Sequence, residues 1–85
     1  MPKSVFTDAY TTVVESLIAL RKASGVTQVE LARRLGKPQQ FVSAVERRER
    51  RVDVIEFCVI VRAIGGDPKA IFADVADALP TETSI

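Results

Sequence analysis

The stretch from Thr27 to Glu46, TQVELARRLGKPQQFVSAVE, decides the fold of this chain. Thr27 and Glu30 have the pattern of a capping box, which predicts that a helix begins at this point. Gly36 ends that helix, because glycine readily takes the left-handed conformation that follows a helix end. Pro38, which a first helical turn tolerates, then opens a second helix, with an uncapped start at Lys37. The stretch therefore predicts two short helices joined by a tight glycine turn.

Each of these two helices has one apolar side. The inward face predicted for the first helix consists of Val29, Leu31, Ala32 and Leu35. The second helix has apolar residues at Phe41, Val42 and Val45. Its other side carries polar residues, which are Gln39, Gln40, Ser43 and Arg47. The polar face of the second helix is free to project from the molecule.

The rest of the chain predicts three more helices. One runs from about Asp8 to Ser24, and another begins at a second capping box, formed by Asp53 with Glu56, and ends at two glycines. The last lies between Pro68 and Pro80. Because no strand alternation is found, we expect an all-α fold of five helices. Residues 1–85 are interpreted as a single domain with a core at about 8–79, a short flexible N-terminal arm and a C-terminal tail.

Composition narrows the functional classes. The chain has 85 residues, of which 47% are hydrophobic, and its size suits one small domain. It has no histidine and only one cysteine, Cys58, which lies on an apolar helix face. We therefore expect no disulfide, no metal site or other cofactor, and no catalytic residue. No apolar run is long enough for a membrane span or a secretory signal. The sequence is that of a cytoplasmic protein that is not an enzyme.

Charge is distributed unevenly along the chain. Residues 21–51 contain nine lysines and arginines but three glutamates, a net charge of +6. Residues 52–85 have a net charge of −4, and residues 1–20 contribute −1, so the whole chain reaches only +1. A basic middle segment of this kind favours contact with a polyanion such as DNA.

Three segments together carry a resemblance to a known family. They are LRKASGVTQVELARRLG, then PQQFVSAVERRER, then DVIEFCVIVRAIGGD with the DPKAIF that overlaps its end. The chain resembles the phage repressor/Cro-like helix-turn-helix proteins, also called Xre-like, from Leu17 to about Phe72. The step of eleven residues from Gln28 to Gln39 agrees with that family. The resemblance implies a compact repressor-like DNA-binding domain in which helices two and three form the helix-turn-helix.

The resemblance also implies roles for polar residues of this motif. Gln28 would contact a DNA phosphate, and the unpaired N–H groups at a helix N-terminus suit an anion independently of the family. Gln39 and Gln40 would read base edges, because a glutamine amide can donate to and accept from adenine. Ser43 and Ala44 lie a turn further along, where a hydroxyl could reach base or phosphate and a methyl could touch thymine.

The arginines that follow the motif are implied to bind phosphate. Arg47, Arg50 and Arg51 occupy the loop with which the family contacts the DNA backbone; Arg33 and Arg34 are weaker candidates. Arg48 stands where the family usually has glycine. Either it adopts a positive φ at some cost in strain, or the preceding helix continues for another turn.

A buried ion pair is a further implication of the resemblance. Arg21 and Glu46 match two family positions that join helix one to the end of helix three. A bidentate bond between guanidinium and carboxylate fixes geometry, so this pair would orient the recognition helix.

Helix four departs from the family pattern. Its core side would be served by Val54, Phe57, Cys58, Val61 and Ile64. Ile55 and Val59 then fall at positions that are usually polar, which leads us to predict a two-fold dimer interface formed by these residues with part of the last helix. The alternative is that Val5 and Phe6 of the N-terminal arm, or Val75 and Leu79 of the last helix, cover both residues.

These observations favour a sequence-specific binder of double-stranded DNA, a small repressor or Cro-like regulator that acts as a homodimer. One alternative is an antitoxin and autorepressor whose acidic C-terminal region binds a toxin. Another is a protein-interaction module that has kept the fold without reading DNA. Strong salt dependence of DNA binding would separate the DNA binder from the interaction module.

Overall fold

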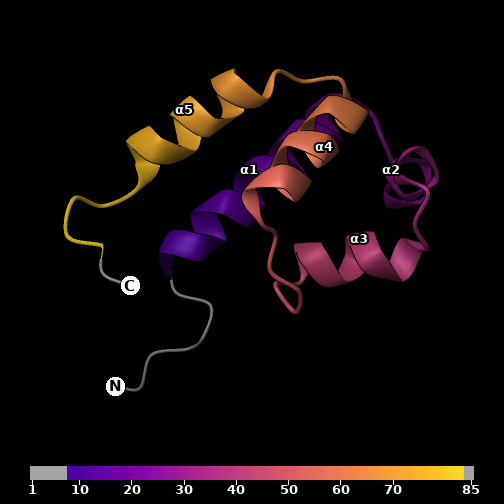
Figure 1. Cartoon of the computed structure of the whole chain (residues 1–85), viewed down its shortest axis with the longest axis horizontal. Helices are drawn as coiled ribbons and strands as arrows, with labels where there is room; N and C mark the ends of the chain where they lie inside the picture. Colours follow the sequence, from indigo (N-terminus) through magenta and orange to yellow (C-terminus); the bar gives the residue numbers. More distant parts are fainter. Residues whose placement is uncertain (1–7, 84–85) are drawn as a thin grey trace.

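The computed structural model describes residues 8–83, and this part of the chain forms five helices without a strand (Figure 1). They are α1 (Asp8–Ala23), α2 (Gln28–Leu35), α3 (Gln39–Glu46), α4 (Val54–Ile64) and α5 (Pro68–Ala78). The expected all-α architecture is confirmed, and the predicted helix bounds hold to within one residue except at the start of α3. No helix in the described range is long and apolar enough to cross a membrane.

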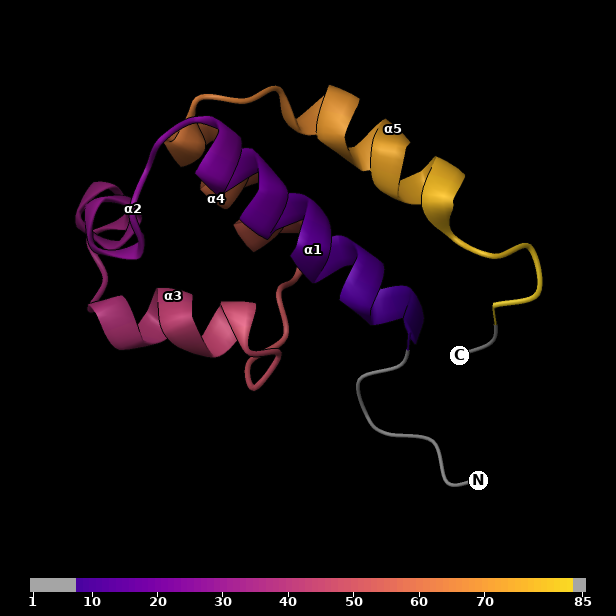
Figure 2. The ribbon, with the colours of Figure 1, turned by 180° about the vertical axis from the view of Figure 1, so that it is seen from behind.

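Helices α1 and α4 form the centre of the molecule. Each of them packs on the other and on α5, while α1 also contacts α3 and α4 also contacts α2. The α2–α3 pair lies on one side of this centre and α5 on the other, as the two opposite views show (Figures 1 and 2). Helix α3 lies against α1 and α2, and its buried Val42 and Val45 line a small cavity with Ile60 and Ile64 of α4, so its outer side is left at the edge of the molecule.

Two helix starts show how far the predicted capping boxes form. At α4 the box is complete: the Glu56 amide donates to Asp53 Oδ1 at 2.7 Å, and the Asp53 amide donates to Glu56 Oε1 at 3.1 Å. At α2 only half of it forms, because the Glu30 amide donates to Thr27 Oγ1 at 3.0 Å whereas the Glu30 carboxylate bonds Arg33 and Arg34. Competing arginines on the next turn therefore remove the second bond of the α2 box.

The turn between α2 and α3 depends on two residues. Gly36 has φ 67°, a left-handed conformation that glycine adopts without a steric penalty, and the amide that follows it closes the helix end on Ala32. Pro38 is extended, with ψ 156°, and is itself the N-cap residue. The predicted start at Lys37 was therefore wrong, because an extended Pro38 cannot belong to the helix; the expected lack of a side-chain cap is confirmed.

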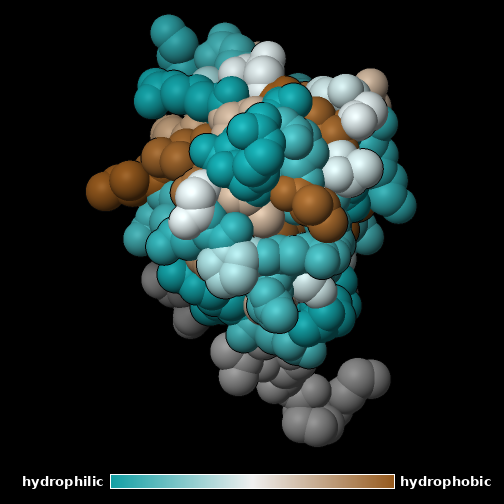
Figure 3. Space-filling model, turned by 90° about the vertical axis from the view of Figure 1, so that its right-hand side faces the viewer, coloured by the Kyte–Doolittle hydropathy of each residue, from teal (hydrophilic) through white to brown (hydrophobic). Residues whose placement is uncertain are grey.

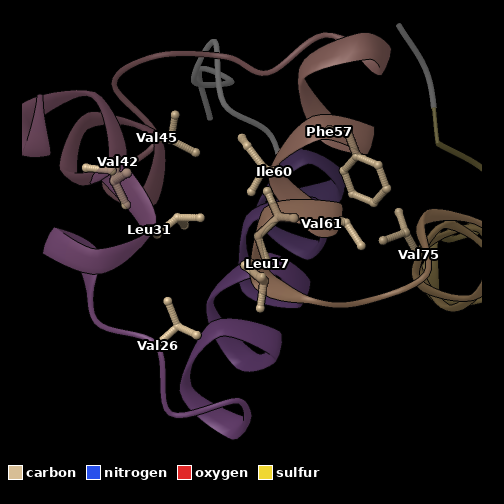
Figure 4. Packing of buried hydrophobic residues seen from close by; sticks show 11 residues of the cluster. Leu17, Val26, Leu31, Val42, Val45, Phe57, Ile60, Val61 and Val75 are labelled. Carbon is tan, nitrogen blue, oxygen red and sulfur yellow. The ribbon is translucent and has the colours of Figure 1, made fainter. Parts of the chain in front are cut away.

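The core is a single cluster that draws on all five helices (Figure 4). Its buried members are Leu17, Val26, Leu31, Ala32, Val42, Val45, Phe57, Ile60, Val61, Ile64 and Val75. Figure 4 shows Val75 of α5 directed toward Phe57 and Val61 of α4. This one core cluster thus holds α2 and α3 to the other three helices.

Two core assignments made from the sequence were wrong, the assigned Cys58 is only half-buried, and one core residue was missed. Val29 is 62% exposed, because at 100° per residue it lies well away from the inward direction of Leu31 and Leu35. Val54 is 73% exposed, since it is the first residue of α4 and lines an open groove instead of the core. Ile60, which was not assigned to the core, is 5% exposed, because it is three residues after the buried Phe57.

The exit from α3 takes the strained course that the sequence left open. Arg48 has φ 61°, the only positive φ at a non-glycine residue in the described part of the chain. Its amide donates to Val45 O at 3.0 Å, and the Glu49 amide donates to Ala44 O at 2.9 Å, so the helix ends and the chain turns back. The alternative, an extra helical turn, does not occur, because α3 ends at Glu46.

Replacing Arg48 with glycine should therefore stabilise the fold. Relief of the left-handed strain outweighs the greater chain entropy of glycine, so we expect a gain of about 0.5–1 kcal/mol in the free energy of unfolding. Urea denaturation would measure it. Arg48→Ala is the control, because it removes the same side chain but keeps the Cβ atom; an equal gain in both variants would contradict the strain argument.

Candidate nucleic-acid interface

Helix α3 presents one polar face outward. The inward side of the helix is formed by the buried Val42 and Val45. At 100° per residue, the opposite side carries Gln39, Gln40, Ser43, Ala44 and Arg47. The first two are exposed, Ser43 and Ala44 are half-buried, and Arg47 is exposed. The structure thus brings together on one surface five of the residues that the sequence singled out.

A buried ion pair ties the end of α3 to α1. Arg21 Nε donates to Glu46 Oε2 at 2.6 Å, and Arg21 Nη2 donates to Glu46 Oε1 at 2.9 Å. Both side chains are only 10% exposed. Arg21 Nη1 also donates to the Val26 carbonyl at 2.9 Å, so the guanidinium holds the α1–α2 turn as well. The pair links α1, the turn before α2, and the last residue of α3.

Gln28 connects this ion pair to the exposed face of α3. Gln28 Nε2 donates to Glu46 Oε1 at 2.9 Å, and Gln39 Nε2 donates to Gln28 Oε1 at 3.3 Å. An ionised carboxylate can only accept hydrogen bonds, so the nitrogen of Gln28 faces Glu46 and its oxygen faces Gln39. Gln39 then keeps its carbonyl oxygen and one N–H available for another molecule. The series of hydrogen bonds from Arg21 through Glu46 and Gln28 therefore sets the orientation of the Gln39 side-chain amide.

Arg47 lies at the C-terminal end of the same face. Its Nε and Nη2 donate to the Glu49 carboxylate at 3.2 and 3.0 Å, and its Nη1 donates to Ser43 Oγ. These bonds lower the pKa of Glu49 below its ordinary value, because the carboxylate is stabilised by the guanidinium. Glu49 therefore remains ionised at neutral pH, and Arg47 is paired with a carboxylate of its own chain.

Arg50 and Arg51 are held in the loop between α3 and α4. Arg50 makes two bonds to the Glu56 carboxylate, at 3.0 and 2.8 Å, and its guanidinium lies 4.7 Å from the centre of the Phe41 ring. Arg50, together with the Asp53 amide, lowers the pKa of Glu56 to about 2. Arg51 lies 4.5 Å from the centre of the Tyr10 ring, and Tyr10 Oη accepts the Val52 amide at 3.1 Å. Aromatic rings thus support both guanidinium groups.

The supporting residues were not identified from the sequence. Glu49 and Glu56 pair with arginines two and six residues away across an irregular loop, a spacing that no helical rule predicts. Tyr10 reaches the same loop from α1, a contact that only tertiary structure creates. The Glu30 pairs with Arg33 and Arg34 are different, because their spacing of three and four residues is a sequence signal for helical ion pairs.

Helix α4 has an apolar outer side. Ile55 is 75% exposed and Val59 is 48% exposed, on the side opposite the buried Phe57, Ile60 and Ile64. Helix α5 does not cover them, and Val5 and Phe6 lie outside the described residues. Figure 3, which views the right-hand side of Figure 1, shows a mostly hydrophilic surface from which separate hydrophobic side chains protrude.

The geometry of α2 and α3 defines a helix-turn-helix protein, since two short helices meet across a three-residue turn that contains glycine. The chain matches the helix-turn-helix family model over residues 17–71. It is 47% identical to the solved structure of an XRE-family like protein from Pseudomonas syringae pv. tomato str. DC3000, with a TM-score of 0.80 over 85% of this chain and 88% of that chain. No curated protein matches the chain significantly.

The chain belongs to the Xre-like helix-turn-helix family, as the sequence resemblance indicated. Its fold is that of DNA-binding transcription regulators. Among the described residues, no group of three or more side chains could hold a metal ion.

Removal of Arg21 should destabilise the fold strongly. Arg21→Ala leaves the buried Glu46 carboxylate without its counter-ion, so we expect a loss of about 3–5 kcal/mol in the free energy of unfolding, measured by chemical denaturation. A double variant, Arg21→Met with Glu46→Leu, should lose less, because no buried charge remains. Unfolding of Arg21→Ala at the wild-type denaturant concentration would refute a stabilising role for the pair.

Proposed function

We propose that this protein is a small, cytoplasmic transcription regulator, a repressor or Cro-like protein, that binds double-stranded DNA at a specific sequence as a homodimer. Helix α3 enters the major groove. The observation that carries the proposal is the hydrogen-bonded chain from Arg21 through Glu46 and Gln28 to Gln39, which ends on the exposed face of that helix. Ordered amides on a projecting helix are what direct base readout requires.

The dimensions of α3 suit a major groove. Eight residues give a helix about 12 Å long, and the groove is about 12 Å wide, so one helix can enter and present its outer side to a few base pairs. The opposite side is held by Val42 and Val45 in the core. Gln39, Gln40, Ser43 and Ala44 therefore face the base edges in the proposed complex.

Gln39 is the residue proposed to select a base. Its amide is oriented by Gln28, and the groups left free are one carbonyl oxygen and one N–H. Adenine offers N7 as an acceptor and N6 as a donor, which matches that pair of groups. Gln28 lies in the first turn of α2, where free backbone amides favour a phosphate oxygen. In the proposed complex one glutamine holds the backbone and the other reads the base.

Arg47, Arg50 and Arg51 are proposed to contact phosphates on the flank of the site. They lie at the end of α3 and in the loop after it, within the segment of +6 net charge. Each phosphate neutralised contributes about 0.9 to the slope of log affinity against log salt concentration. Their existing carboxylate and aromatic contacts hold the guanidinium groups near the surface beside α3.

The proposed dimer uses the outer side of α4. Ile55 and Val59 are four residues apart and expose apolar surface that a monomer leaves in water. In the proposed dimer a two-fold axis lies there, and both copies of α3 meet one side of a DNA duplex. Dimers of this class set their recognition helices about 34–36 Å apart, on successive turns of the major groove.

Selection of bound sequences from a random pool of duplex DNA tests DNA readout. We expect a palindrome with half-sites about 10 base pairs apart. Gln39→Ala should lose preference at one base pair of each half-site, a change of about 1–3 kcal/mol in discrimination. Gln40→Ala is the matched comparison and should affect a different base pair. If wild-type protein enriches no sequence, the fold serves another purpose, such as binding a protein partner.

Sedimentation equilibrium tests the dimer. The wild-type chain should show twice its monomer mass of 9.3 kDa, and Ile55→Glu with Val59→Glu should restore the monomer, because two buried charges oppose association. Val29→Glu is the control, since the exposure of Val29 falls between those of Ile55 and Val59 but Val29 lies on α2. An identical mass for wild type and the double variant would place the interface elsewhere or show that none exists.

A further inference from the structure

The end of the polar α3 face carries a carboxylate where the proposed ligand is a polyanion. Arg47 is the last residue of that face, and Glu49 follows two residues later. The left-handed turn at Arg48 brings the chain back, and the bond from the Glu49 amide to Ala44 O holds it there. As a result, the Glu49 side chain lies beside Arg47 instead of pointing away along a continuing helix.

The contact between these two side chains is direct and exposed. Two nitrogens of Arg47 bond the two oxygens of Glu49, at 3.2 and 3.0 Å. The side chains are 58% and 61% exposed, so the bond can be broken without burying a bare charge. While it persists, Arg47 offers little net positive charge to an approaching phosphate.

The neighbouring arginine is held differently. Glu56, the partner of Arg50, also accepts the Asp53 amide in the capping box of α4. Arg50 itself donates to the Arg51 carbonyl at 2.9 Å and lies over the Phe41 ring. Glu56 is therefore tied to the start of α4 as well as to Arg50, whereas Glu49 lies in the loop and caps no helix.

We propose that Glu49 sets the DNA affinity of this protein by competing with a backbone phosphate for the guanidinium of Arg47. On binding, Arg47 exchanges the Glu49 carboxylate for a phosphate oxygen, while its bond to Ser43 holds the side chain at the end of α3. This inference rests on the proposed DNA binding and adds a residue that opposes it. Because the competition concerns the backbone only, it changes affinity without changing the preferred sequence.

The test is a double-mutant cycle on DNA affinity. Glu49→Gln should bind a mixed-sequence duplex of about 20 base pairs roughly three- to fivefold more tightly than wild type at low salt, the range of an exposed ion pair. Arg47→Gln should bind more weakly. In the Arg47→Gln background, Glu49→Gln should have no further effect. Asp77→Asn is the matched control, because it removes one exposed acidic charge from α5, away from the α3 face.

Each outcome of the cycle has a definite reading. A similar gain from Glu49→Gln in both backgrounds would mean general repulsion of DNA and would overturn competition for Arg47. An unchanged affinity of Glu49→Gln, with wild type binding DNA, would reject this inference alone. If wild type and all variants fail to bind DNA, although circular dichroism shows them folded, the proposed function falls and the inference with it.

Discussion

The bidentate ion pair between Arg21 and Glu46 is the interaction on which the helix-turn-helix geometry depends. Helix α3 lies against α1 and α2, and the pair joins the last residue of α3 to α1 inside a nearly dry environment. The same guanidinium holds the Val26 carbonyl in the turn before α2. Because breaking one half of such a pair leaves an unsolvated charge, the orientation of α3 is coupled to the stability of the whole fold.

This pair also organises polar groups at the surface. The Glu46 carboxylate accepts a bond from Gln28, and Gln28 in turn accepts one from Gln39. Three side chains from α2 and α3 are thus ordered by one buried charge on α1. A site of this kind is preorganised, since the amide orientations are decided before a ligand arrives.

The basic segment is less positive at its surface than its composition indicates. Arg33 and Arg34 pair with Glu30, Arg47 pairs with Glu49, and Arg50 pairs with Glu56 of the acidic segment. Local neutralisation of this kind reduces the attraction of any polyanion and leaves specificity to polar groups on α3. Binding to DNA would then involve exchange of partners by arginine side chains, a process that is sensitive to salt.

The sequence by itself determined the five helices, their order and the glycine turn at Gly36, because capping residues, glycine and proline act through local backbone geometry. It also indicated the polar face of α3, since helical periodicity is local too. It misplaced Val29 and Ile60, whose directions relative to the buried Leu31 and Phe57 were misjudged, and Val54, which lies at the start of α4 beside an open groove. Only the tertiary structure decided the partners of Gln39, Arg47, Arg50 and Arg51, since Gln28, Glu49, Glu56 and Tyr10 reach them across turns or from another helix.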